Sequence, residues 1–210
     1  MADLFEGLDA SRIGAMPDGF SYVPDLIGVE EEARLIEAFA DYDLQSFVHM
    51  GNPSRRQVRN FGVDFDYERK VAVAAPPIPE IFDPVLDAVA ARTGTPRSEL
   101  VELLVTYYPA GAEITWHRDS RAFELVFGVS LLADAELRLR PASRKGRHRG
   151  DVLKFVAARR SLYALSGPAR TDWMHHVPPV KTPRYSLTIR TLRPGTIIYP
   201  AAQLAQYSQS

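Results

Sequence analysis

The feature that most constrains the fold is a series of short runs of β-branched and aromatic residues in the second half of the chain. Turn residues separate these runs at close and fairly regular intervals, which is typical of antiparallel strands in a sandwich or barrel and not of βαβ units. The runs cover residues 101–108, 114–116, 125–132, 136–139, 151–155, 161–165 and 185–192. This half of the chain is therefore predicted to be mainly β.

Two helices are predicted before these strands. Residues 25–39 repeat apolar side chains on one helical face and carry acids near the start. A second helix is predicted over about residues 80–92 and ends at Gly94. Residues 47–75, rich in arginine and aromatic residues, indicate strand and loop. The fold class that follows is α+β, mainly β, with flanking N-terminal helices.

A chain of 210 residues is long enough for one well-packed domain and short for two. We expect a single domain over residues 21–195, a poorly ordered leader over 1–20 and a C-terminal tail over 196–210. The first residues lack the layout of a signal peptide, and no stretch is long and apolar enough to cross a bilayer. We therefore expect a cytoplasmic monomer with no membrane partner.

The chain contains no cysteine. This excludes disulfides, a thiolate nucleophile, a zinc ribbon and a cysteine-ligated iron–sulfur cluster. Any metal site must therefore use histidine, aspartate, glutamate or main-chain oxygen.

The net charge of −1 argues against binding nucleic acid through overall charge. Arginines nevertheless gather in two places, at Arg55, Arg56 and Arg59 and again over residues 138–149. These clusters are either solvated loops or local patches that contact phosphate, and the sequence leaves both interpretations open.

Two separate segments offer metal ligands. His117 and Asp119 are two residues apart, so in a strand both side chains project from one face. A third ligand is available far downstream, from His175 or His176. Two histidines and one carboxylate leave three coordination positions open, which an oxygen-activating iron requires. Zinc accepts the same ligands, so this set alone does not fix the metal.

Segment 184–190 carries a polar face with an arginine at each end, alternating with apolar and aromatic residues. Burying that face would be costly without an anionic partner, and an arginine binds a carboxylate through two hydrogen bonds. A dicarboxylate keto acid fits this face, and an edge strand facing water is the alternative. Thr106 and Tyr108 share a face of an earlier strand, and the tyrosine either brings a hydroxyl to a carboxylate or is an ordinary core residue.

These elements, in this order, resemble the AlkB family of Fe(II)- and 2-oxoglutarate-dependent dioxygenases. The resemblance covers about residues 20–193. It depends on Tyr108 before a Pro-Ala-Gly turn, the triplet His117-Arg118-Asp119, a distal histidine two residues after Trp173, and the string Arg-Tyr-Ser-Leu-Thr-Ile-Arg at 184–190. It implies a double-stranded β-helix of the jelly-roll type with helices outside it.

The resemblance also implies a site. Fe(II) is expected to be held by His117, Asp119 and His175, with His176 on the alternate face. Thr106 stands where members often have asparagine, and its hydroxyl is expected to donate to the co-substrate. The residues implied to bind 2-oxoglutarate are Thr106, Tyr108, Arg184 and Arg190.

The implied reaction consumes 2-oxoglutarate and O2, gives succinate and carbon dioxide, and oxidises a methyl group on nitrogen that leaves as formaldehyde. The implied substrate is an alkylated base in DNA or RNA, favoured in single strands because the base must be flipped into the pocket. Residues 47–75 resemble the substrate-covering lid of the family. Arg56, Phe61 and Tyr67 are the expected substrate contacts.

Two alternatives stay open. The same oxygenase chemistry could act on a protein side chain or a small molecule. Ser120 and Arg121 favour this, because several DNA-repairing members have an acidic residue just after the metal aspartate. The other alternative is a jelly-roll binding module with an incidental metal site, against which the complete triad and both arginines argue.

Overall fold

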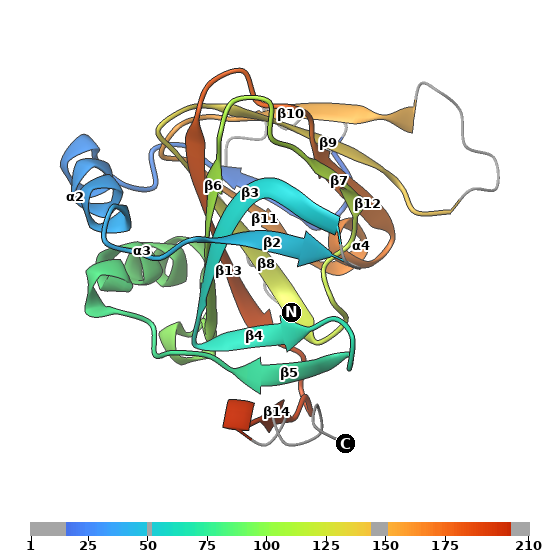
Figure 1. Ribbon diagram of the computed structural model, residues 1–210. Helices are drawn as coiled ribbons and strands as arrows, with labels where there is room; N and C mark the ends of the chain where they lie inside the picture. Colours follow the sequence, from blue (N-terminus) through green and yellow to red (C-terminus); the bar gives the residue numbers. More distant parts are fainter. Residues whose placement is uncertain (1–15, 50–51, 144–150, 203–210) are drawn as a thin grey trace.

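The computed structural model describes residues 16–49, 52–143 and 151–202 (Figure 1). Within these residues the strands form three sheets. The largest sheet has seven strands, in the spatial order β1 (Phe20–Val23), β11 (Leu162–Leu165), β8 (Phe123–Leu131), β13 (Arg184–Leu192), β6 (Glu102–Tyr108), β3 (Asn52–Phe61) and β2 (Gln45–His49).

The other two sheets are smaller. The four-stranded sheet runs in the order β10 (Leu153–Ala157), β9 (Ala135–Pro141), β12 (Trp173–Val177) and β7 (Ile114–His117). The third contains β14 (Ile198–Tyr199), β5 (Val71–Ala74) and β4 (Val63–Asp66). All pairings in the two larger sheets are antiparallel.

The chain passes back and forth between the two larger sheets from β6 to β13. Strands β6, β8, β11 and β13 belong to the seven-stranded sheet, and β7, β9, β10 and β12 belong to the four-stranded sheet. This alternation is the winding of a jelly roll, in which the inner faces of two sheets enclose a core. The predicted fold class is confirmed, including the runs chosen as strands.

Helices α2 (Val29–Phe39) and α3 (Asp83–Thr93) cover the outer face of the seven-stranded sheet (Figure 1). Gly94 ends α3 with a φ of 69°, a left-handed conformation that glycine adopts without steric cost. Two 3₁₀ turns flank α3, at Glu80–Phe82 and Arg97–Glu99, and a short helix α4 (Gly167–Thr171) precedes β12. The sequence did not indicate α4.

The two larger of the three hydrophobic clusters in the described residues result from this layering. One lies between the helices and the large sheet and includes Leu35, Phe82 and Leu187. The other lies inside the roll and includes Leu139 and Phe155. None of the helices in the described residues is long and apolar enough to span a membrane.

Two boundaries differ from those expected, and one segment contains more strand than expected. Phe20, placed at the end of the leader, is buried in β1, which pairs with β11. The predicted tail begins with Ile198–Tyr199, which pairs with β5. Residues 47–75 are largely strand, and β3 is hydrogen-bonded to β6 over residues 57–61. That this segment covers a substrate stays a prediction.

Candidate metal centre and co-substrate cavity

A cavity lies inside the roll, between the two larger sheets. The residues predicted from the sequence to bind the metal and the co-substrate line this cavity. The lining residues used below are Arg56, Thr106, Tyr108, His117, Asp119, Tyr163, His175, Arg184 and Arg190.

The three expected metal ligands meet at one end of this cavity. Pairing of β12 with β7 sets His175 opposite His117, and Asp119 lies two residues after the end of β7. The two imidazole rings are 4.1 Å apart between centroids, and the Asp119 Oδ2 atom lies 3.5 Å from His175 Nε2. One ligand atom from each residue lies within 4.8 Å of the other two.

Both histidines are held in the neutral form that binds metals. The His117 Nδ1–H donates to the carbonyl oxygen of Thr115 at 2.8 Å, which leaves Nε2 with its lone pair. Burial lowers the pKa of His117, although Asp119 opposes the shift. Burial also lowers the pKa of His175 to about 3, with a further contribution from His117.

Asp119 presents one oxygen to the protein and leaves the other without a partner. Oδ1 accepts hydrogen bonds from Arg190, at 3.0 Å from Nε and 2.6 Å from Nη2. Oδ2 is buried and has no hydrogen-bond donor. Burial would raise the pKa of Asp119, but the adjacent Arg190 guanidinium outweighs it and holds that pKa well below its ordinary value. A buried, ionised oxygen facing two neutral imidazoles fits a divalent cation.

Arg190 lies between two buried carboxylates. Its Nη1 donates to Glu102 Oε1, while its other nitrogens engage Asp119. The structure thus places Arg190 at the metal end of the cavity and against a metal ligand, and its contact with 2-oxoglutarate stays a prediction. Glu102 was missed, although an acid inside the apolar run 101–108 was the available signal.

Arg184 lies at the other end of β13, beside Tyr108. The Arg184 guanidinium carbon is 5.0 Å from the centroid of the Tyr108 ring, and Nη2 donates to Ser130 Oγ at 2.9 Å. Pairing of β13 with β6 sets Arg184 opposite Tyr108 and Ser186 opposite Thr106. The structure therefore brings the predicted co-substrate residues to one cavity.

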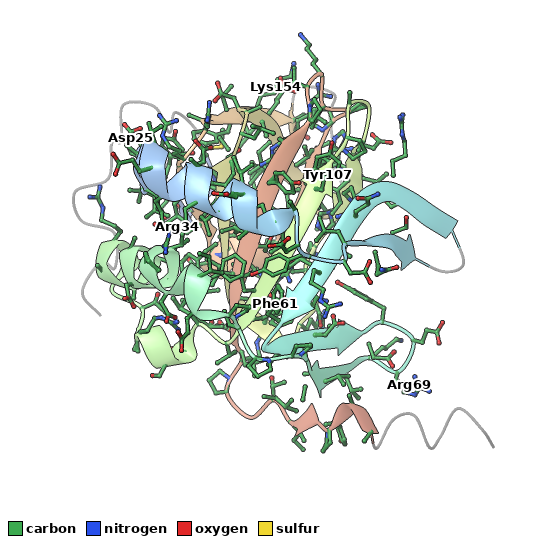
Figure 2. All side chains as sticks on the ribbon, turned by 60° about the vertical axis from the view of Figure 1, so that its left-hand side comes forward. Asp25, Arg34, Phe61, Arg69, Tyr107 and Lys154 are labelled. Atoms are coloured by element: carbon green, nitrogen blue, oxygen red, sulfur yellow. The ribbon has the colours of Figure 1, made fainter. Side chains whose placement is uncertain are left out.

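The three predicted substrate contacts lie in three different environments. Arg56 is 7% exposed and lines the cavity, 5.9 Å from the Tyr108 ring. Tyr67 is 47% exposed and packs edge-on against Phe65. Phe61 is a wrong prediction, because its ring is 4% exposed in the core beneath the helices and contacts Phe82 (Figure 2).

The remaining residues singled out in the sequence do not line the cavity. His176 packs against Trp116 and lies 3.6 Å from Glu113, on the face opposite His175. Arg138 pairs with Glu136. Residues 144–149 of the basic cluster lie outside the described residues.

A jelly roll whose inner cavity ends in two histidines and one carboxylate is the architecture of the mononuclear non-haem oxygenases. A sequence profile of the 2OG-Fe(II) oxygenase superfamily matches residues 19–194. The chain belongs to this superfamily.

Curated relatives narrow the likeness to AlkB-type proteins. A mouse protein described as tRNA (carboxymethyluridine(34)-5-O)-methyltransferase ALKBH8 is 27% identical over 180 residues, covering 80% of this chain and 25% of that protein. An Arabidopsis thaliana protein described as alkylated DNA repair protein ALKBH8 homolog is 25% identical over 217 residues, covering 87% of this chain and 61% of that protein. The chain thus spans only part of each relative.

Solved structures agree on the fold. The structure of OsALKBH1 has a TM-score of 0.64 and 16% identity, covering 84% of this chain and 98% of that chain. A Pseudomonas putida prolyl-4-hydroxylase has a TM-score of 0.55 and 18% identity, covering 84% and 94%. Within the 2OG-Fe(II) oxygenase superfamily the chain is thus similar to AlkB-type proteins, and the three ligand residues fit the Fe(II) that this superfamily uses with 2-oxoglutarate and O2. When bound, the iron supplies the oxidising chemistry, and His117, Asp119 and His175 would hold it.

Proposed function

We propose that the protein oxidatively demethylates alkylated bases in DNA or RNA, with a preference for single strands, releasing formaldehyde and succinate. One structural observation carries the proposal. Tyr67 is 47% exposed and packs edge-on against Phe65, whose ring contacts Phe123. The Arg190 guanidinium lies 5.0 Å from the centroid of the Phe123 ring, so this row of aromatic rings leads from the surface towards the metal ligands. An aromatic ring at that position can stack on a base brought towards the metal.

Arg56 adds a cation to the same cavity. A guanidinium there can contact a phosphate or a base edge, which suits an anionic polymer better than a neutral metabolite. The names of the relatives support the same class of substrate, since one refers to tRNA and another to alkylated DNA.

The direct test is mass spectrometry of oligonucleotides that carry one 3-methylcytosine. Matched single-stranded DNA, single-stranded RNA and duplex DNA are incubated with the protein, Fe(II) and 2-oxoglutarate in air. We expect loss of the methyl group with the wild-type protein, fastest on a single strand, and none with His117→Ala. Tyr67→Ala should weaken oligonucleotide binding while leaving 2-oxoglutarate affinity unchanged.

One observation favours a second candidate. Ser120 and the exposed Arg121 follow Asp119, at the position where DNA-repairing members often carry an acid. The same chemistry on a protein side chain or a small molecule would then apply. Unchanged oligonucleotides, together with conversion of 2-oxoglutarate to succinate by the same preparation, would support that candidate over demethylation.

A further inference from the structure

The end of the cavity near Arg184 contains a tyrosine that packs directly on a glycine. Strand β11 pairs with β8 so that Tyr163 lies opposite Gly128. A Cβ atom on Gly128 would lie 2.2 Å from Tyr163 Cζ and 2.5 Å from its hydroxyl oxygen. No larger residue at 128 leaves the ring in place, so the phenol occupies the space of the missing side chain.

The surroundings fix the ring and its ionisation state. Phe20 lies parallel to Tyr163, with 6.5 Å between ring centroids and an interplanar angle of 4°. Burial, and then the nearby Tyr108, raise the pKa of Tyr163 well above its ordinary value. The phenol is therefore a neutral O–H donor at neutral pH.

The neighbouring Arg184 lacks an anionic partner. It is 3% exposed, Nη2 donates to Ser130 Oγ, and Nε is buried without an acceptor. In the part of the chain that the structure describes, no salt bridge engages its guanidinium. A buried cation without a carboxylate is expensive, and an incoming carboxylate would remove that cost.

We propose that Tyr163 is a co-substrate residue that closes this end of the cavity, donating its hydroxyl to the distal carboxylate beside Arg184 and limiting the keto acid to five carbons. Gly128 is the position that admits the ring. The inference depends on the use of 2-oxoglutarate and is independent of which substrate is oxidised.

The test measures keto-acid binding in the absence of turnover. Calorimetric titration of the Mn(II)-loaded protein, without oxygen, gives the affinity for 2-oxoglutarate and for 2-oxoadipate, which is one methylene longer. Loss of one hydrogen bond to a charged group in Tyr163→Phe should weaken 2-oxoglutarate binding by at least about tenfold. Tyr163→Ala, which opens the wall, should shift the preference towards 2-oxoadipate by about tenfold or more.

The matched control is Tyr107→Phe. Tyr107 precedes Tyr108 in β6 but packs on the helix side of the sheet against Tyr185, so both affinities should match those of the wild-type protein. Gly128→Ala should reproduce the weakened binding, because its methyl group displaces the ring. Wild-type affinity and wild-type length preference in Tyr163→Phe and Tyr163→Ala would overturn the proposal, as would a wild-type protein that binds no keto acid. Failure to demethylate oligonucleotides would leave it standing.

Discussion

Replacing Arg190 by methionine should destabilise the metal-free protein strongly. The guanidinium is 8% exposed and donates hydrogen bonds to two buried carboxyl groups, those of Asp119 and Glu102. Burial raises the pKa of Glu102 to about 8, so this carboxyl group is largely protonated at pH 7 and Asp119 carries the charge that Arg190 compensates. Asp119 would be left as a buried charge. Breaking a buried pair on one side costs about 3–5 kcal/mol, which is the loss expected in the free energy of unfolding.

The measurement is urea denaturation at pH 7, with Arg193→Met as the matched control. The Arg193–Glu124 pair has a similar N–O distance, 2.7 Å, but its side chains are 43% and 45% exposed. Exposed pairs contribute at most about 1 kcal/mol, so this control should change little. A loss below about 1 kcal/mol in Arg190→Met, or equal losses in both variants, would refute the reasoning.

Metal should reverse part of the Arg190→Met defect. A divalent cation beside Asp119 replaces the missing positive charge, so Mn(II) should stabilise this variant. At one hundred times its dissociation constant the gain is about 2.7 kcal/mol. The same addition should leave the stability of Arg190→Met/Asp119→Asn unchanged, because the anionic ligand is gone.

Three further predictions follow from the site and the cores. His175 stays neutral in the folded metal-free protein down to a pKa of about 3, whereas the unfolded chain binds a proton below pH 6.5. This residue should therefore lower the free energy of unfolding by up to about 1.4 kcal/mol per pH unit below 6.5, and His175→Gln should lack that slope in urea titrations between pH 7 and 5. Asp119→Asn should abolish Mn(II) binding in calorimetry while the far-ultraviolet circular dichroism stays native; retained tight binding would disprove the ligand assignment. Phe61→Ala should cost about 3–5 kcal/mol in urea denaturation and leave 2-oxoglutarate affinity unchanged, and a selective loss of substrate binding without loss of stability would contradict its place in the core.

The burial of Phe61 follows from the alternation of side chains along a strand. Strand side chains alternate with a period of two, so Arg56 and Phe61, five residues apart, face opposite sides of one continuous strand. The prediction that residues 47–75 are partly loop did not take this alternation into account. Pairing of β3 with β6 makes the strand continuous through this region and sends the phenylalanine to the helix side.

Segment 184–190 follows the same alternation of side chains. The polar residues line the cavity and the intervening ones join the core beneath the helices, as predicted. Only side-chain period and polarity were needed, and both are readable over seven consecutive residues.

The sequence by itself predicted the class of fold, the His117–Asp119 pair and the polar face of segment 184–190, because each depends on residue types and spacings within a short stretch. Tertiary structure alone decided which groups meet across the roll. Glu102 and Asp119 both accept hydrogen bonds from Arg190, and Tyr163 fills the space above Gly128. Glu32, one of the acids near the start of α2, is buried, accepts a hydrogen bond from the Leu132 amide and pairs with Arg159. Such contacts join strands and helices that are distant along the chain, so their partners depend on sheet order and register, which no local pattern specifies.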